Sequence, residues 1–148
     1  MNYYDPEKAA KVWQRVQGST DTMAVGLQGL LLQAVSDEKT YIALSRRAPE
    51  DIRKSLQKMA RQEARHIACL KGICTLVRGA APQITAPTPQ ADTLDAALRK
   101  CYRNALQSLA AYESRSSDSD YGAAFAQMAA EKRAQCVQIL SLLGNYCK

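Results

Sequence analysis

Four stretches of the chain carry apolar residues at alternating intervals of three and four, the spacing of a helix that buries one face. The clearest stretch covers residues 50–78, and its apolar stripe consists of Ile52, Leu56, Met59, Leu70, Ile73 and Val77. The other three stretches cover residues 21–47, 92–115 and 120–146. A chain of 148 residues is long enough for one domain with its own core, so the pattern predicts an all-α four-helix bundle over residues 1–148.

Two positions in the stripe of residues 50–78 are polar, Glu63 and His66. Their spacing of three places both side chains on the face that the stripe turns toward the core. The stripe of residues 120–146 is interrupted in the same way, by Lys132 and Gln135. Because a charged side chain in a core is costly unless it is paired, these positions predict a polar site inside the bundle.

The remaining residues complete the predicted layout. Residues 1–19 hold a short amphipathic pattern that starts at Asp5 and Pro6 and stops at Gly18, which predicts a separate N-terminal helix. Residues 79–92 hold three prolines and no periodicity. Fourteen such residues extend over about 43 Å, and a helix of about 28 residues is about 42 Å long. This segment can therefore cross the whole bundle, which predicts that the second and third long helices run parallel.

The chain looks like two copies of one helical hairpin joined by the Pro-rich segment. The first and third long stretches superimpose on their apolar stripes, and so do the second and fourth. The corresponding positions are Glu63 and Lys132, His66 and Gln135, Ala34 and Ala105, and Tyr41 and Tyr112. The repeat is weak in identity but consistent in phase, which predicts two hairpins of the same shape.

On these residues the whole chain resembles the rubrerythrin-like branch of the ferritin-like superfamily. Residues 37–41 with 62–66 carry the resemblance in the first hairpin, and residues 112–115 with 128–132 carry it in the second. The resemblance implies two hairpins joined by a long crossover, two metal ions in the middle, and redox chemistry with oxygen or peroxide. It also implies a Glu seven residues before each Tyr, a Glu-x-x-His on each partner helix, and tyrosines that hydrogen-bond the ligand carboxylates.

Most ligand positions that the resemblance implies hold other residues here. The replaced positions are Ala34, Ala105, Lys132 and Gln135. Only Glu63 and His66 match, which leaves a vestigial half-site. In that family the two central Glu residues face one another, so the resemblance implies that Lys132, in place of one of them, lies against Glu63 and pairs with it. An ammonium group at this place also repels cations. We expect no resident cofactor, and iron or manganese if a metal binds at all.

A second hypothesis uses carboxylates that lie beside the stripes. Glu38, Glu113 and Glu131 would join Glu63 and His66 if the helices rotated by about a quarter turn. Such a site would make the protein a non-haem iron or manganese oxidoreductase, or a peroxide-reducing enzyme. Two functions therefore stay open, this enzyme and a non-catalytic bundle that acts through packing or partners.

Composition limits both hypotheses. No apolar run approaches the roughly 18 residues of a membrane span and the first residues are polar, so we expect a cytoplasmic protein without a membrane segment. The five cysteines form no Cys-x-x-Cys pair, which argues against a zinc or rubredoxin-type iron site. The net charge of +6 includes a basic outer face within residues 53–65, but no aromatic residues are interleaved, which does not favour nucleic acid. We expect a homodimer.

Overall fold

The computed structural model describes the backbone of residues 6–146 and the side chains of residues 26–145. This part of the chain forms four helices and no strands: α1 (Pro6–Ser45), α2 (Glu50–Arg78), α3 (Leu94–Ser114) and α4 (Gly122–Tyr146). The largest contacts join α1 to α2 and α3 to α4, and smaller contacts join α1 to α3 and α2 to α4. The predicted all-α four-helix bundle is confirmed. Over the described residues, no helix combines enough length with enough apolar character to span a bilayer.

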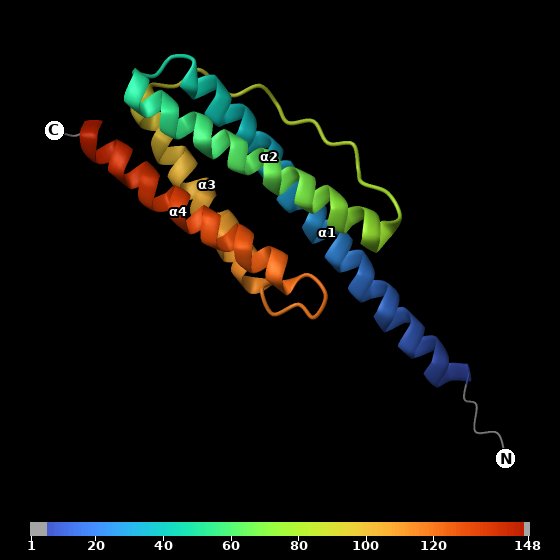
Figure 1. The fold of residues 1–148 in the computed structure, drawn as a ribbon. Coiled ribbons are helices and arrows are strands. Elements are labelled where there is room, and N and C mark those ends of the chain that lie inside the picture. Colours follow the sequence, from blue (N-terminus) through green and yellow to red (C-terminus); the bar gives the residue numbers. More distant parts are fainter. Residues whose placement is uncertain (1–5, 147–148) are drawn as a thin grey trace.

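The two hairpins are joined by the crossover, residues 79–93, which has no helix of its own. Figure 1 shows the crossover leaving the end of α2 and running back along the bundle to the start of α3. The helices α2 and α3 therefore run parallel, as the length of the Pro-rich segment predicted. Lys39 on α1 holds the crossover midway, because its Nζ donates to the carbonyl oxygen of Ala86 at 2.7 Å.

The predicted break at Gly18 is wrong. The helix α1 continues from Pro6 to Ser45, so that it includes both the short amphipathic segment and the first long stretch. One glycine inside a helix costs only about 1 kcal/mol relative to alanine, which a helix of 40 residues tolerates. The first helical residue is Pro6, as the sequence predicted, whereas Asp5 lies outside the described residues.

Local signals set the ends of the helices. Gly79 follows α2 in the left-handed region, with a φ of 85°, where a side chain would be strained. The Thr93 hydroxyl accepts a hydrogen bond from the backbone N–H of Ala96 at 3.2 Å and so caps α3. Before α4, Oδ1 of Asp118 accepts the backbone N–H of Tyr121 at 2.7 Å. These local features mark the end of α2 and the starts of α3 and α4.

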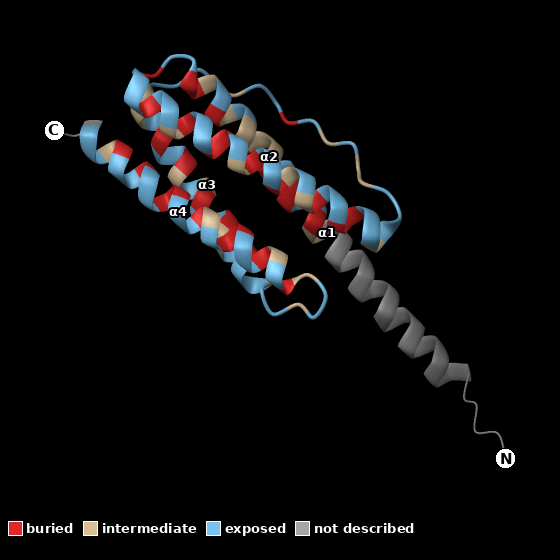
Figure 2. Ribbon diagram, in the orientation of Figure 1, coloured by how far each residue is buried: buried red, intermediate tan, exposed pale blue. Residues whose placement is uncertain are grey.

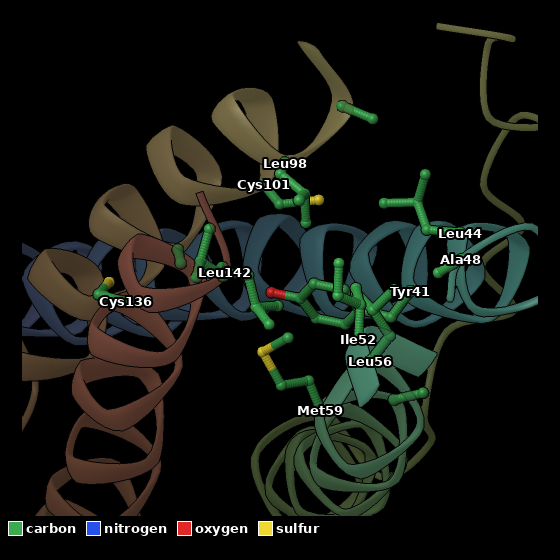
Figure 3. Close-up of a cluster of buried hydrophobic side chains, with 14 residues drawn as sticks. Tyr41, Leu44, Ala48, Ile52, Leu56, Met59, Leu98, Cys101, Cys136 and Leu142 are labelled. Atoms are coloured by element: carbon green, nitrogen blue, oxygen red, sulfur yellow. The ribbon is translucent and has the colours of Figure 1, made fainter. Parts of the chain in front are cut away.

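The apolar core divides into two clusters. Figure 2 shows the buried residues on the helix faces that turn toward the middle of the bundle. One cluster surrounds Tyr41 and Leu56 (Figure 3), and the other surrounds Leu27 and Phe125. On every helix, buried polar residues lie between the members of the two clusters. These residues are Asp37 on α1, Glu63 and His66 on α2, Ser108 on α3, and Lys132 and Gln135 on α4. The fold thus places a polar layer across the middle of the bundle.

Candidate functional site

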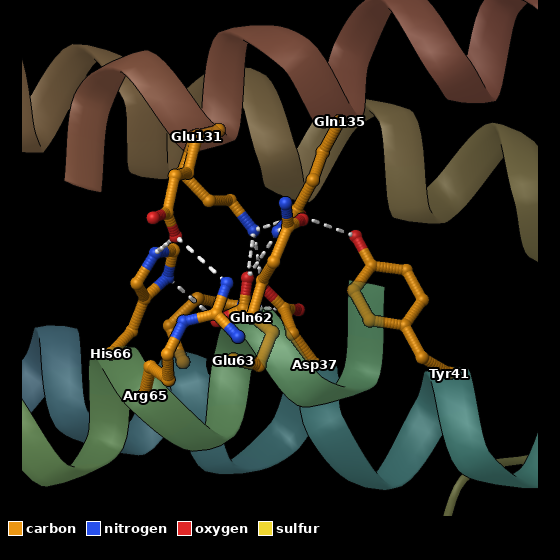
Figure 4. A network of polar contacts seen from close by, with 10 residues as sticks. Asp37, Tyr41, Gln62, Glu63, Arg65, His66, Glu131 and Gln135 are labelled. Atoms are coloured by element: carbon orange, nitrogen blue, oxygen red, sulfur yellow. Dashed lines mark hydrogen bonds and ion pairs between the residues drawn. The ribbon is translucent and has the colours of Figure 1, made fainter. Parts of the chain in front are cut away.

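Lys132 is the centre of the polar layer. Its side chain comes from α4 and is fully buried, with a relative exposure of 0%. Its Nζ donates to Oε1 of Glu63 at 2.6 Å, to Oε1 of Gln135 at 2.9 Å and to Oδ2 of Asp37 at 3.3 Å. Figure 4 labels these three partners. An ammonium group has three N–H donors, and here each has an oxygen within reach. The predicted pairing of Lys132 with Glu63 is confirmed.

Gln135 connects Lys132 to two further helices. Its Oε1 accepts hydrogen bonds from Lys132 and from the Tyr41 hydroxyl, the latter at 3.0 Å. Its Nε2 donates to Oε1 of Glu63 and to Oε1 of Gln62, both at 3.1 Å. The amide oxygen therefore faces two donors and the amide nitrogen faces two acceptors. This arrangement fixes the orientation of the amide and satisfies its polar atoms.

His66 lies between two carboxylates. Its Nε2 is 2.7 Å from Oε2 of Glu131 on α4, and its Nδ1 is 3.4 Å from Oε2 of Glu63 one turn earlier on α2. The second contact has the distance of an ion pair but not the alignment of a hydrogen bond, so Nδ1 is a buried nitrogen without a hydrogen-bond partner in the described part of the chain. Each ring nitrogen therefore faces a carboxylate, one from α4 and one from α2. Glu131 is 20% exposed, so this contact links the polar layer to the surface.

Burial and ion pairing shift the pKa values of the polar layer in opposite directions, and ion pairing has the larger effect at the centre of the layer. Burial raises the pKa of Glu63, but Lys132 and then His66 outweigh it and hold that pKa below its usual value. Burial lowers the pKa of Lys132, but Glu63 and Asp37 outweigh it and leave that pKa above its usual value. At Asp37 burial prevails, and the pKa is raised even though Lys132 opposes the rise. Lys132 and Glu63 therefore form the main ion pair, and Asp37 is the weaker partner.

Asp37 is a member of the site that the sequence did not single out. Asp37 and Glu38 both fit the three-and-four spacing of the stripe in residues 21–47, and the structure buries Asp37, which lies one turn before Tyr41. Its Oδ1 accepts a hydrogen bond from Gln33 at 2.8 Å, and its Oδ2 faces Lys132. The spacing alone could not have identified it, because Asp37 and Glu38 lie four and three residues before Tyr41 and both steps share a helix face.

The carboxylates of the second hypothesis come together only in part. Glu131 meets His66, as that hypothesis required. Glu38 instead lines a surface groove between α1 and α2, and Glu113 forms a surface ion pair with Arg133. The described structure thus gathers one of the three additional carboxylates around Glu63 and His66 and leaves the other two outside.

The remaining predicted positions lie in the core. Ala34 and Ala105 are buried and belong to the two apolar clusters, one to each. Tyr41 reaches Gln135 through its hydroxyl, as described above. Tyr112 packs its ring edge-on to His66, with 5.8 Å between the ring centroids.

The contacts of the layer repeat between the two hairpins. His66 corresponds to Gln135 and Glu131 to Gln62, and the pair His66–Glu131 is matched by the pair Gln135–Gln62. In the same way, Tyr41 next to Gln135 is matched by Tyr112 next to His66. Corresponding positions make corresponding contacts, so the register inferred from the stripes is reproduced in space.

The residues present do not fit a pair of metal ions. The ammonium group of Lys132 lies where a cation would have to approach Glu63, and it would repel that cation. Over the described residues, no group of three or more His, Cys, Asp or Glu side chains is arranged to hold a metal. Comparisons of the chain with models of protein families, with curated proteins and with solved structures find no match.

Proposed function

We propose that this protein is a ferritin-like helical bundle of rubrerythrin-like design in which an internal ion network stands in place of a di-metal centre. We propose further that it is non-catalytic and acts through packing and protein partners. The single observation that supports this most is the contact of 2.6 Å between Nζ of Lys132 and Oε1 of Glu63, both fully buried. A lysine in that place supplies the positive charge that the carboxylates need and leaves no room for a second cation.

Metal analysis of the purified protein tests the proposal. The chain is expressed with iron and manganese in the medium, and the metal content per chain is measured. We expect less than about 0.2 Fe, Mn or Zn per chain, because a genuine site in a folded protein is close to stoichiometric. The matched control is the double variant Glu63→Gln, His66→Gln, which removes the candidate ligands. Metal that stays in this variant is bound elsewhere.

Near-stoichiometric metal that disappears in the control variant would contradict the proposal. It would favour the enzyme instead, with Glu63, His66 and Glu131 as ligands, and turnover of peroxide or oxygen would be the next measurement. Glu38 and Glu113 are then tested by substitution, because they would have to move from the positions described above.

The partner is proposed to be a second copy of the chain. The outer face of α4 exposes two large apolar side chains one turn apart, Val137 at 65% and Leu140 at 50%. Contact with a second copy would remove these two neighbouring apolar side chains from water, which favours association at this face. We expect a dimer by light scattering, which Leu140→Glu dissociates. Leu76→Glu is the control, because Leu76 is also exposed, at 74%, but lies on α2. A monomeric parent protein would contradict the homodimer.

A further inference from the structure

A pocket lies under the crossover, at the end where it approaches α3. Its volume is about 440 Å³, which is within the range of about 300–1,000 Å³ for small-molecule sites. The crossover forms one wall with residues 87–92, and α1 and α3 form the others. No residue of the polar layer lines the pocket, and the buried Cys101 beneath it belongs to an apolar cluster.

The sequence explains why this pocket stays open. Pro87 and Pro89 stiffen the crossover, which is held on one side by the hydrogen bond from Lys39 to Ala86 and on the other by the Thr93 cap of α3. Below it, small residues line the helices, among them Ser36, Ala43 and Ala97. A stiff segment held at both ends above small side chains cannot collapse onto them.

The charged side chains that line the pocket indicate the charge of a ligand that would fit it. Arg47 from the turn after α1 and Lys100 from α3 both line the pocket, and neither has an ion-pair partner among the described residues. Asp92 from the crossover adds one carboxylate, so that one positive charge remains in excess. The base of the pocket is apolar, since Leu44 and Cys101 are buried there. One excess positive charge above an apolar base suits a monoanion with an apolar body.

We propose that this pocket binds a small aliphatic or aromatic monocarboxylate. The carboxylate lies at Arg47 and Lys100, where an arginine fork offers paired donors. The apolar body lies against Ala43, Leu44 and Ala97 and displaces water from them. This site is independent of the ion network around Lys132, so either proposal can fail without the other.

Calorimetric titration of the full chain with octanoate and benzoate tests this proposal. Octanol and octylammonium are the matched comparisons, because they share the octanoate chain and lack its negative charge. We expect at least one carboxylate to bind about tenfold or more tightly than either comparison, since the charge-assisted contacts are lost. No binding of either carboxylate, or equal binding of octylammonium, would overturn the proposal.

Variants locate the site. Arg47→Gln and Lys100→Gln should each weaken carboxylate binding by about tenfold, and Lys58→Gln on the outer face of α2 should leave it unchanged. Ala43→Leu should abolish binding by filling the pocket. If that variant does not fold, Asn104→Leu fills the pocket from α3. Amide chemical shifts of the parent chain should move on titration around residues 43–47, 88–92 and 100–104. Undiminished binding in the filled variant, or shifts confined to other regions, would overturn the assignment.

Discussion

The two hairpins share a framework and differ in the charge at its centre. In the first hairpin α2 contributes Glu63 and His66, and in the second α4 contributes Lys132 and Gln135 at the corresponding positions. The apolar residues around them remain equivalent, with Met59 matched by a methionine and Leu70 by an isoleucine. The framework therefore accepts the buried carboxylate of Glu63 in the first hairpin because the second hairpin supplies the ammonium group of Lys132. Complementarity between the halves, rather than identity, is what the polar layer requires.

The largest effect should come from removing the cation of the second half. Lys132→Ala leaves Glu63 and Asp37 buried without their partner, which should lower the free energy of unfolding by about 3–5 kcal/mol. Urea denaturation measures it. The neighbouring exposed variant Arg133→Ala is the control and should change stability by less than about 1 kcal/mol, because its ion pair lies on the surface. A stable Lys132→Ala protein would show that the two halves are not coupled through this pair.

The double variant Lys132→Met, Glu63→Gln sharpens that result. It removes both charges of the main ion pair and keeps side chains of similar volume, so it should be more stable than Lys132→Ala. A double variant no more stable than Lys132→Ala would indicate that lost packing, rather than the unpaired carboxylate, causes the destabilisation.

The contribution of Glu63 in the first hairpin to the free energy of unfolding should depend on pH. Glu63 has a lower pKa in the folded chain than its ordinary value of 4.5, so its ionised form stabilises the fold above that pH. This contribution is lost as the pH falls through the lowered pKa. We expect Glu63→Gln to cost about 2–3 kcal/mol near pH 7 and progressively less below about pH 4. Denaturation curves of both proteins across this range test it, and a constant difference would contradict it.

The two hairpins also differ at the start of their second helices. Arg53 and Gly122 occupy corresponding positions, and the backbone N–H of each bonds to the residue four before it. A Cβ on Gly122 would lie 2.5 Å from the carbonyl oxygen of Ser116, so Gly122→Ala should cost about 1–3 kcal/mol. The control Gly72→Ala on α2 meets open space and should stabilise by about 0.5–1 kcal/mol. Equal melting temperatures of the two variants would contradict this difference.

The smallest effect on the free energy of unfolding should come from substituting Asp37, which corresponds to Ser108 in the second hairpin. Burial raises its pKa even though Lys132 opposes the rise, whereas the pKa of Glu63 is lowered, so the fold favours ionised Asp37 less than ionised Glu63. Asp37→Asn should therefore change the free energy of unfolding by less than about 1 kcal/mol, well below the effect of Glu63→Gln. If the two substitutions cost the same, the two carboxylates share Lys132 equally.

The stripes predicted most of the fold and part of the site. A sustained spacing of three and four located α2 to the residue, and the length of the crossover predicted that α2 and α3 run parallel. The pairing of Lys132 with Glu63 was implied by the resemblance, which places these two positions opposite each other, and the structure confirms that contact. Glu131 was predicted only as one of three additional carboxylates, and the sequence did not distinguish it from Glu38 and Glu113, which lie outside the site. Two features could not be predicted. The stripe could not choose between Asp37 and Glu38, because they differ by one residue and both fit its spacing. Gly18 does not interrupt α1, because the free-energy cost of one glycine in a helix is small compared with the stability of the residues on either side of it.

The central claim, that a lysine occupies the place of a metal centre, is tested most directly by rebuilding that centre. The variant carries Ala34→Glu, Ala105→Glu, Lys132→Glu and Gln135→His, which places a carboxylate or imidazole at every replaced position. Without metal it should melt below the parent chain, because its carboxylates repel one another in the core. Ferrous or manganous ion should reverse that loss and bind in near-stoichiometric amount, because binding to the folded state stabilises it. The measurement is the melting temperature with and without metal, together with metal content. A variant that folds well but binds no metal would contradict the register and the claim built on it.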